Sequence, residues 1–458
     1  MKLDNVINLT FVNQSGKEDE KEINNNNKNE SFNVNKSQII TINGNNIIEE
    51  NIKIILKNDS KNINIKKVPE FKYEIDLSKI LAVGLVNLGN TCFMNSCLQC
   101  FYHCSEFTRE LLKNYKYYDD KKTEILNAYL RTVKLLYDNG KNKNNNKNIV
   151  LIDKIDNKYA NTSLNKKRYY YENKTEPVSA NLFYKCLKRN FHLTSGEGSD
   201  PKVVAELILS QINKELNNNY IYRLDTNLKK TDEIALFNHI FSAYFKKQNS
   251  TVVSSFFYWI KEKVYICSEC GNSTFNFQPN YILYFYPKTI LKDFYFLFGG
   301  NKEDLSLEIC FEYFHKSDEL ELDNKFNSFT CKSCNKRTKA KSILNYMATL
   351  PKYLVLCLYK DKDEENSIDI NFSYGTEIDL KKFYKDFKVE KNVSTKYKFQ
   401  GGCYSRYNDI HIVALCIHFD GLLYEFNDSY YRKYESPDSF KKVYDETPYL
   451  LIYRRSDI

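Results

Sequence analysis

Cys92 stands where a loop enters a predicted helix, a position at which a thiol can act as a nucleophile. The stretch GLVNLGNTCFMNSCLQC (residues 84–100) reads as a glycine-punctuated loop followed by apolar residues at helical spacing. Asn90 and Thr91 are suitable N-cap residues, which puts Cys92 at the first helical turn. Unpaired backbone N–H groups and the positive end of the helix dipole favour a thiolate there. The alternative is a small buried hydrophobic residue, which is what we expect of the later cysteines on the same helix.

Candidate bases for such a thiol are few, because the chain has six histidines. Two of them, His411 and His418, lie in one predicted strand. A second alternating segment, LYEFNDS (residues 423–429), follows after a Phe-Asp-Gly turn. If the two segments pair as a hairpin, Asn427 or Asp428 lies near His411 and can orient its imidazole. An ordinary surface hairpin is the alternative.

Two Cys-x-x-Cys pairs give the clearest metal signal. Cys267 and Cys270 form one pair and Cys331 and Cys334 the other, and each is followed by Gly or Asn, which lets the chain turn. Four thiolates can hold one tetrahedral zinc ion at about 2.3 Å. Roughly sixty residues separate the pairs, so the ion would clamp the base of a long β excursion. Redox pairs are the alternative, but neither pair opens a helix. The pattern favours one structural Zn²⁺ with no open ligand position.

The elements that must position these residues come in two groups, helices first and strands second. Helices are predicted over residues 123–137 and after Asp200, with Pro201 in the first turn. From about residue 254 short alternating segments rich in aromatics indicate β structure. The clearest strands are predicted over residues 354–359, 411–419 and 449–453. This order predicts the α+β class.

Two stretches are rich in Asn and Lys and carry no lasting period. Residues 1–76 are predicted to be a disordered tail, and residues 139–174 a low-complexity insertion in a domain that spans 77–458. Much of the net charge of +9 comes from Lys in such runs, so the charge alone does not indicate nucleic acid. No Arg/Lys-rich helix accompanies the cysteine pairs either. A nucleic-acid partner is therefore not expected.

Composition sets the class of protein and its compartment. The chain is 42% hydrophobic and 15% aromatic, which excludes a disordered protein overall. Its first residues lack the apolar segment of a signal peptide, and no run approaches the roughly 18 apolar residues of a membrane span. The 13 cysteines are therefore expected in a reducing compartment, the cytoplasm and/or the nucleus, as metal ligands, a nucleophile or core residues. No membrane partner is expected.

The order of these features resembles the ubiquitin-specific proteases, the papain-like cysteine deubiquitinases. The matching segments are GLVNLGNTCFMNS (84–96) for the Cys box, LPKYLVL (350–356) for a core strand, IHIVA (410–414) for the His strand, YEFNDS (424–429) for the Asn/Asp-Asp-Ser box and YLLIYRR (449–455) for the closing strand. The resemblance covers about residues 80–455. It implies a papain-like fold with a helical thumb, a β-rich palm and zinc-ribbon fingers at about 254–346.

The resemblance also implies a role for each site residue. Cys92 would attack the carbonyl of ubiquitin's C-terminal glycine. His411 would take the thiol proton and pass it to the departing amine, usually a lysine ε-amine. Asn427 would fix the tautomer of His411, with Asp428 beside it as a helper. Asn87 would donate a hydrogen bond to the oxyanion, and removing one such donor typically lowers a rate by on the order of 10²–10³.

The sequence departs from the family where the substrate tail is held. Of the family's Gln-Asp-x-x-Glu box only Glu206 fits, as a substrate-binding residue, and Val203 stands where an Asp usually contacts ubiquitin's basic tail. Ile410 and Ile412 replace the Gly and the aromatic that flank the family's His. Three interpretations follow: a deubiquitinase acting on ubiquitin and ubiquitinated proteins, a catalytically weak ubiquitin-binding protein of the same fold, and a protease for a ubiquitin-like modifier. The intact catalytic set favours the first.

Overall fold

The computed structural model of the chain describes a single compact unit, which spans Tyr73–Ile458. The described residues are 75–115, 123–141, 148–152, 169–173, 175–193, 198–217, 232–245, 250–298, 304–316, 328–359, 371–406, 411–434 and 448–458. The tail predicted over residues 1–76 lies outside them, except for its last two residues. Described structure thus begins close to the position that the sequence predicts.

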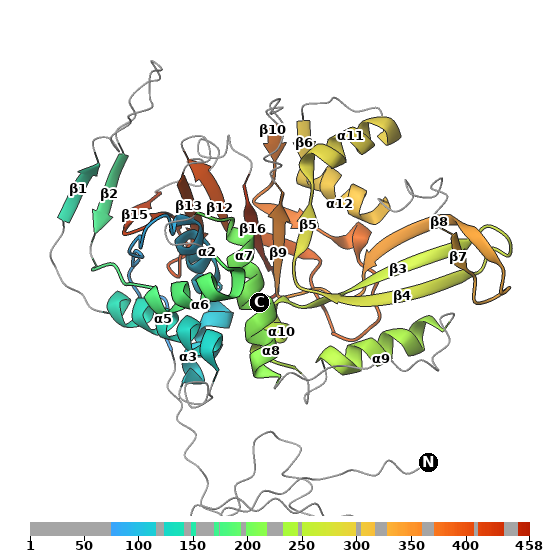
Figure 1. Cartoon of the computed structure of the whole chain (residues 1–458), viewed down its shortest axis with the longest axis horizontal. Helices are drawn as coiled ribbons and strands as arrows, with labels where there is room; N and C mark the ends of the chain where they lie inside the picture. The colour runs from blue at the N-terminus through green and yellow to red at the C-terminus, as the bar shows by residue number, and fades with distance from the viewer. Residues whose placement is uncertain are drawn as a thin grey trace, which may run out of the picture. The chain divides into compact units, whose positions relative to one another are not determined.

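The helices lie mostly in the first half of the unit (Figure 1). They are α2 (Cys92–Tyr102), α3 (Ser105–Lys113), α5 (Glu124–Lys141), α6 (Asn181–Phe191), α7 (Pro201–Glu206), the π-helical η1 (Leu207–Gln211), α8 (Ile212–Leu216), α9 (Glu233–Phe245), α10 (Val252–Phe257), α11 (Pro287–Phe298), α12 (Leu307–Lys316) and the 3-10 helix η3 (Lys381–Phe383). Asp200 accepts a hydrogen bond from the Lys202 N–H at 2.8 Å, so α7 begins where its capping signal predicts. Of the helices that the structure describes, none has the length and hydrophobicity needed to cross a membrane.

The larger sheet forms the palm, and the strands that carry the candidate base lie in its middle. Its order is β1-β2-β15-β14-β13-β12-β16-β9-β5, with β11 paired to β12. Its strands are β1 (Asn148–Ile152), β2 (Tyr169–Asn173), β5 (Leu283–Phe285), β9 (Tyr353–Leu358), β11 (Glu377–Asp379), β12 (Lys396–Arg406), β13 (His411–Ile417), β14 (Leu423–Asn427), β15 (Tyr430–Lys433) and β16 (Leu450–Arg455). The predicted hairpin is confirmed, because β13 and β14 pair in antiparallel fashion. The α+β class predicted from the sequence is confirmed as well.

Two palm strands lie inside the segment predicted as a low-complexity insertion, residues 139–174. β1 and β2 pair along their whole length, and β2 joins the sheet where Glu172 pairs with Tyr431 of β15. Their sequences, NIVLI and YYYEN, are rich in residues that favour strands. The insertion therefore extends the palm by two strands. Composition did not predict these strands, because the residues around them are rich in Asn and Lys.

The smaller sheet forms the fingers, at the right of Figure 1. Its order is β4-β3-β8-β7, and β3 pairs with both β4 and β8 over most of its length. Its strands are β3 (Trp259–Cys267), β4 (Ser273–Asn280), β7 (Ser328–Thr330) and β8 (Arg337–Met347). The fingers predicted at about 254–346 thus consist of two separate segments of the chain, one with β3 and β4 and one with β7 and β8. Between them the chain returns to the palm through β5, and a short parallel pair, β6 (Asp304–Ser306) with β10 (Asn371–Ser373), lies beyond it.

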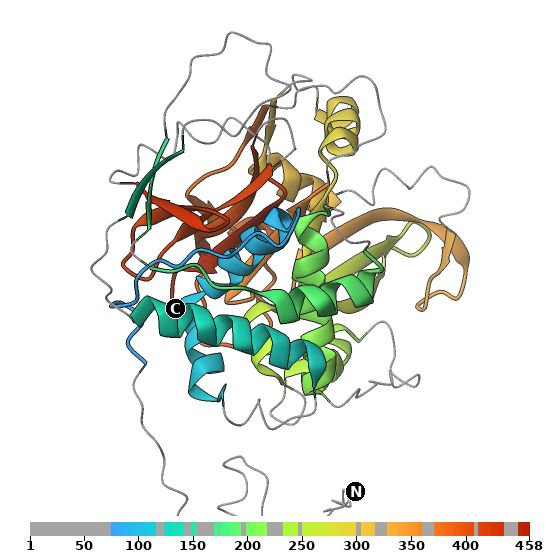
Figure 2. The same ribbon diagram turned by 60° about the vertical axis from the view of Figure 1, so that its left-hand side comes forward.

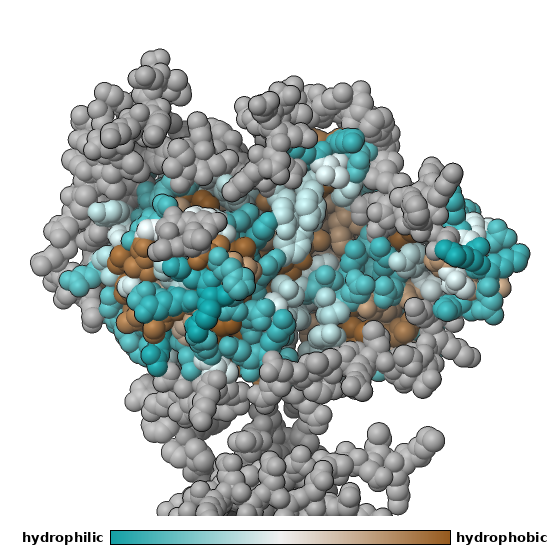
Figure 3. All heavy atoms as spheres, in the orientation of Figure 1, coloured by the Kyte–Doolittle hydropathy of each residue, from teal (hydrophilic) through white to brown (hydrophobic). Residues whose placement is uncertain are grey.

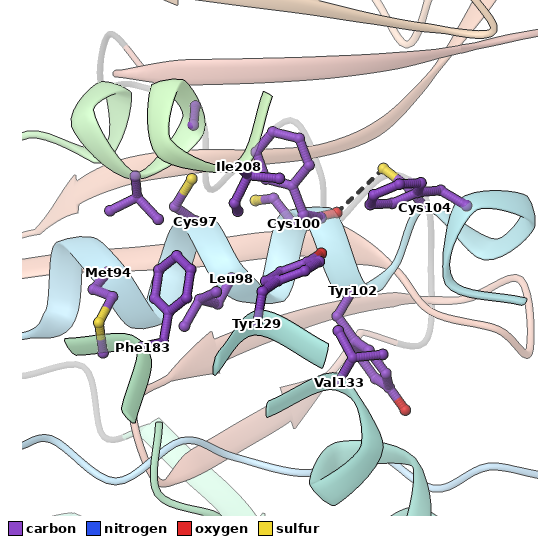
Figure 4. Packing of buried hydrophobic residues seen from close by; sticks show 14 of the residues in the cluster. Met94, Cys97, Leu98, Cys100, Tyr102, Cys104, Tyr129, Val133, Phe183 and Ile208 are labelled. Carbon is purple, nitrogen blue, oxygen red and sulfur yellow. Dashed lines mark hydrogen bonds between the residues drawn. The ribbon is translucent and has the colours of Figure 1, made fainter. Parts of the chain in front are cut away.

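Helix α2 runs through the middle of the largest core, between the other helices and the palm sheet (Figures 1 and 2). All its residues from Phe93 to Tyr102 are buried. Around Met94 and Leu98 pack Tyr129 and Phe183 from α5 and α6, with Ile208 of η1 close by (Figure 4). A helix enclosed on all sides at the density of a protein interior has little freedom to move. The core therefore fixes the element that carries Cys92.

Candidate active site

Cys92 is the first residue of α2, and it is only half-buried. Just before it, Gly89 and Asn90 have positive φ values of 98° and 52°, which turn the loop sharply into the helix. Thr91 is the N-cap residue, but its hydroxyl accepts the Leu88 N–H at 2.9 Å and makes no cap bond to the helix. The positive end of α2 is therefore left for the Cys92 thiol and for a bound acyl group.

His411 and Asn427 lie at the ends of the paired strands β13 and β14, next to Cys92. The His411 Nε2–H donates to the Asn427 Oδ1 across 2.7 Å. Cys92 lies close enough to the same imidazole to affect its pKa. Because Asn427 occupies Nε2, Nδ1 is the nitrogen left to take a thiol proton. The structure thus brings together the predicted nucleophile, the predicted base and the predicted orienting group.

The surroundings of His411 raise its pKa. Burial acts to lower it, but the interaction with Cys92, the hydrogen bond to Asn427 and the negative charge of Asp428 outweigh burial. An imidazole with a raised pKa can take a proton from a thiol and hold it beside the thiolate. This is the protonation state that nucleophilic attack by Cys92 needs.

Asp428 was expected to help His411, and the structure gives it other partners. Its Oδ2 lies 3.9 Å from His411 Nε2, which is beyond hydrogen-bond distance. Its two carboxylate oxygens instead accept the side-chain amides of Asn87 and Asn95, each at 2.8 Å. Its backbone oxygen accepts the Leu85 N–H, also at 2.8 Å. Asp428 therefore joins the β14 end of the site to the Cys92 loop and to α2.

Gly84 explains how closely the Cys92 loop approaches the turn after β14. A Cβ atom at this position would lie 2.3 Å from the carbonyl oxygen of Ser429 and 2.8 Å from that of Asp428. Only a glycine allows the two backbones to come so near. The close approach brings the amide of Asn87 within reach of Asp428.

The side-chain amide of Asn87, the predicted oxyanion donor, forms hydrogen bonds through both its oxygen and its nitrogen. Its Oδ1 accepts the backbone N–H groups of Gly89 at 2.9 Å and Thr91 at 3.2 Å. Its Nδ2 donates one hydrogen to Asp428. An amide nitrogen carries two hydrogens, so the bond to Asp428 leaves the second one for the predicted oxyanion contact.

Three residues that matter to this arrangement were missed in the sequence. Asn95, Gln99 and His103 form a buried polar stripe on α2, at intervals of four residues. Asn95 donates to Asp428, and Gln99 donates to the Val83 carbonyl at 2.8 Å. The signal that reveals them is the four-residue spacing of polar side chains on a helix that is otherwise apolar.

Glu206 makes its hydrogen bond to a residue outside this cluster. It ends α7, and its Oε1 accepts the hydroxyl hydrogen of Tyr284 from β5 at 2.6 Å. Burial, followed by this bond, raises the pKa of Tyr284. Nearby, the ammonium of Lys202 lies 3.5 Å from the centre of the Tyr359 ring, and Val203 is half-buried. The predicted substrate-binding carboxylate thus links a helix of the thumb to the palm.

The four cysteines predicted to bind metal converge at the tip of the fingers. The sulfur atoms of Cys267 and Cys334 lie 3.9 Å apart and those of Cys270 and Cys331 3.7 Å apart, and all four lie within 4.8 Å of one another. Four sulfurs at about 2.3 Å from a tetrahedral ion are spaced by about 3.8 Å. Backbone N–H groups in its own knuckle lower the pKa of Cys331 to about 6, whereas at Cys270 a backbone N–H is outweighed by desolvation and by hydrogen bonds with the other three thiols, which raise the pKa to about 11. A bound ion would displace the protons that the four thiols share. The residues present can therefore hold one ion.

The knuckles turn as their sequences predict. Gly271 and Asn335 have positive φ values of 70° and 59°. The N–H of each donates to the carbonyl of the first cysteine in its pair, Cys267 or Cys331. The tip is mainly hydrophilic in the space-filling view (Figure 3). Among the described residues the four cysteines belong to none of the three hydrophobic clusters, so a bound ion would supply cohesion to the site.

Comparison with known proteins gives relatives of one kind. The family model described as ubiquitin carboxyl-terminal hydrolase matches residues 83–453. The chain is 24% identical over 389 residues to ubiquitin carboxyl-terminal hydrolase Usp2 of Drosophila melanogaster, covering 81% of this chain and 35% of that protein. It is 24% identical over 385 residues to ubiquitin carboxyl-terminal hydrolase 8 of Saccharomyces cerevisiae, covering 81% of this chain and 70% of that protein. The chain thus spans about a third of the fly protein.

Solved structures support the same fold. A chain of the SAGA DUB module Ubp8/Sgf11/Sus1/Sgf73 bound to monoubiquitin is similar with a TM-score of 0.53 and 19% identity, covering 91% of this chain and 76% of that one. This likeness confirms the predicted architecture of thumb, palm and fingers. With the family model matched over most of the described unit, the chain belongs to the ubiquitin carboxyl-terminal hydrolase family.

Proposed function

We propose that the chain is a thiol-dependent deubiquitinase, which hydrolyses the isopeptide or peptide bond at the C-terminal glycine of ubiquitin. The observation that carries the proposal is the arrangement of Cys92, His411 and Asn427, with the Nε2–Oδ1 contact at 2.7 Å and Cys92 close enough to the same ring to affect its pKa. Further support comes from the names of the related hydrolases and from the similar structure bound to monoubiquitin.

The first half of the reaction transfers the ubiquitin acyl group to the enzyme. His411 takes the proton of Cys92, and the thiolate attacks the glycine carbonyl. A C–S bond forms, and the tetrahedral intermediate then breaks its C–N bond. The proton on His411 goes to the departing amine, which leaves a thioester on Cys92.

The second half releases ubiquitin. His411 takes a proton from a water molecule, the resulting hydroxide attacks the thioester carbonyl, and the C–S bond breaks. The proton returns to Cys92, and ubiquitin leaves with a free C-terminal carboxylate. In both halves Asn87 donates its second amide hydrogen to the oxyanion, and Asp428 keeps that amide in place through its 2.8 Å bond.

We further propose that the four-cysteine cluster holds one structural Zn²⁺ and takes no part in the chemistry. Its support is the donor set of four thiols and their spacing, which suits a tetrahedral ion. All four ligand positions are filled by protein, so the ion would supply cohesion to the fingers. A reducing compartment, the cytoplasm or the nucleus, would keep these thiols available.

A ubiquitin probe with a thiol-reactive C-terminus tests the proposed activity. The wild-type protein is expected to form a covalent adduct at Cys92, located by mass spectrometry, and Cys92→Ala to form none. Cys186→Ala, which removes a buried thiol on α6, is the matched control and should label as the wild type does. A wild-type protein that binds ubiquitin but forms no adduct would instead be a binding protein. A parallel probe made from a ubiquitin-like modifier decides between the two substrates.

A further inference from the structure

Two buried imidazoles meet at the end of α2 that is remote from Cys92. His103 is the C-cap residue of α2, and His418 directly follows β13. The His103 Nε2 and the His418 Nδ1 lie 2.9 Å apart, and the two residues are 1% and 4% exposed. The outer nitrogens of the pair reach backbone carbonyls, Gln99 at 2.8 Å and Ile80 at 2.9 Å.

The hydrogen bonds of this pair can be assigned by counting protons. Burial lowers the pKa of both His103 and His418, so both rings are neutral near pH 7 and carry one N–H each. The Gln99 carbonyl already accepts the backbone N–H of His103 at 3.1 Å, so it has least need of a second donor. Two N–H groups must then serve three short contacts. The tautomers that join the two rings have His103 Nε2–H donating to His418 Nδ1 and His418 Nε2–H donating to the Ile80 carbonyl, and they leave Nδ1 of His103 beside the Gln99 carbonyl without a proton.

A third side chain joins the same place from the neighbouring strand. Gln400 of β12 donates its amide hydrogens to the His103 carbonyl at 2.8 Å and to the Ile417 carbonyl at 2.9 Å. Its bond to His103 satisfies a carbonyl at the helix end that has no partner within the helix. We call His103, His418 and Gln400 the distal junction.

The helix and the strand are thus joined at both ends. Cys92 contacts His411 at one end, and His103 contacts His418 at the other. Between them α2 is a rigid rod of eleven residues, which is about 16 Å long. A shift of the rod at the distal junction therefore moves Cys92 relative to His411.

Packing alone does not explain an imidazole pair in these surroundings. The rings of Phe419, Phe426 and Tyr424 lie against the pair at centroid distances of 4.7–5.1 Å. Apolar side chains of similar size would fill such a space without the cost of burying polar nitrogens. What a hydrogen-bonded pair adds is one defined direction and distance between helix and strand.

We propose that His103 and His418 are a positioning pair, which sets the alignment of Cys92 with His411 from the far end of α2. The pair touches neither substrate nor the reacting atoms. The expected effect on kcat rests on the proposed function. The expected effect on the position of Cys92 relative to His411 does not depend on it.

Two substitutions of His418 separate the contact with α2 from the contact with Ile80. Asn places its amide near the position of Nδ1, so His418→Asn keeps an acceptor for His103. Gln places its amide near the position of Nε2, so His418→Gln keeps a donor for Ile80 and loses the bond to His103. Both side chains are polar and neutral, and the pair of variants is therefore matched.

The first measurement is alkylation of Cys92 by iodoacetamide between pH 6 and 9, followed by mass spectrometry. An imidazole aligned with the thiol promotes thiolate reactivity at lower pH, and a misplaced one does not. The ratio of the alkylation rates at pH 6.5 and pH 9 is expected to fall by about tenfold in His418→Gln and to stay within about twofold of wild type in His418→Asn. A purely structural role would lower the melting temperature and leave this ratio alone.

The second measurement is hydrolysis of a fluorogenic ubiquitin C-terminal substrate. His418→Gln is expected to lower kcat by about 10- to 100-fold with KM within about twofold, because misplacement of reacting groups acts on the chemical step. Equal alkylation ratios and equal kcat in the two variants would overturn the proposal.

If His418→Gln does not fold, the same comparison is made with substitutions of His103 on the helix. There His103→Asn loses the bond to His418 and His103→Gln keeps it. A wild-type protein without hydrolytic activity refutes the proposed function, and the alkylation ratios still decide the positioning role.

Discussion

The cysteine cluster in the fingers and the Cys92 site differ in how much of the chain each one needs. Each pair of cysteines in the cluster lies within one short knuckle, which has its own backbone hydrogen bond and a residue with positive φ at the turn. The Cys92 site draws on a helix start, a strand start and a strand end, residues 92, 411 and 427. Only the packing of α2 on the palm brings these three together.

The two sites therefore respond to different kinds of damage. A change in one knuckle removes a metal ligand directly, but it leaves the core around α2 intact. A change at Asp428 or in the core leaves the knuckles untouched, but it alters the distances among the catalytic groups. This separation can be tested, and four experiments follow in order of expected effect.

Removing the base should separate the two sites most clearly. His411→Gln keeps a polar group near the position of Nε2, toward Asn427, but has no nitrogen to take the Cys92 proton. We expect kcat for ubiquitin C-terminal hydrolysis to fall by on the order of 10⁴ or more. Metal content, measured by elemental analysis of purified protein, should stay at the wild-type value. A variant that keeps a tenth of the wild-type rate would contradict the assignment of His411.

Removing the oxyanion donor should have the next largest effect. Asn87→Ala is expected to lower kcat by on the order of 10²–10³ with little change in KM. Asp428→Ala should have an effect of the same kind, because it frees the amide of Asn87. Asp428→Ala should also shift the pH–rate profile, because the charge of Asp428 helps to raise the pKa of His411, whereas Asn87→Ala should leave the profile in place. An Asp428 variant that shifts the profile without lowering kcat at its optimum would contradict the role in holding Asn87.

Removing a metal ligand should weaken substrate binding and spare the chemistry. Cys331→Ser is expected to lose the ion and loosen the tip of the fingers, since the four cysteines lie outside the hydrophobic clusters of the described residues. We expect KM to rise by about tenfold with kcat nearly unchanged. The rate of Cys92 alkylation serves as the internal control and should equal that of the wild type. A slower alkylation would mean that the fingers and the Cys92 site are coupled.

The smallest effect concerns the base of the fingers, where tertiary packing also matters. Glu262 of β3 is fully buried and accepts a bond from Lys385 at 3.1 Å, and Lys385 also pairs with Glu233 of α9. Burial raises the pKa of Glu262 to about 7, against the opposing effect of Lys385. A carboxyl whose pKa is raised on folding adds stability at low pH, and this contribution is lost as the pH rises through about 7.

Glu262→Gln should therefore flatten the pH dependence of stability. We expect the melting temperature of the wild type to fall more between pH 5 and pH 8 than that of the variant, as measured by scanning calorimetry. Parallel curves for the two proteins would show that Glu262 does not titrate in this range. Metal content should be the same in both.

Local signals in the sequence were sufficient for the elements and for the fingers site. Asp200 and Pro201 fix the start of α7, and the Phe-Asp-Gly turn fixes the hairpin of β13 and β14, because these signals act over a few residues. The knuckles follow from Cys-x-x-Cys with a residue that tolerates positive φ. Composition was a poorer guide, since it hid β1 and β2 in an Asn/Lys-rich segment.

The partners of Asp428 and the polar stripe of α2 were beyond such signals. Nothing near Asp428 in the sequence indicates Asn87 or Asn95, because those bonds exist only once Gly84 lets the loop pack against the Asp428 turn. The same holds for His103 and His418, which are separated by 315 residues in the sequence but whose ring nitrogens lie 2.9 Å apart.

By itself the sequence predicted the α+β class, most of the elements, the four cysteines that converge in the fingers and a candidate nucleophile with its candidate base. Those depend on residue type, spacing and short-range turns. Only the tertiary structure decided that Asp428 holds amides of the Cys92 loop and α2, and that α2 is joined to β13 at both ends. The physical reason is that two groups form a hydrogen bond when they lie close together in the packed core. The number of residues between them in the sequence does not indicate that closeness.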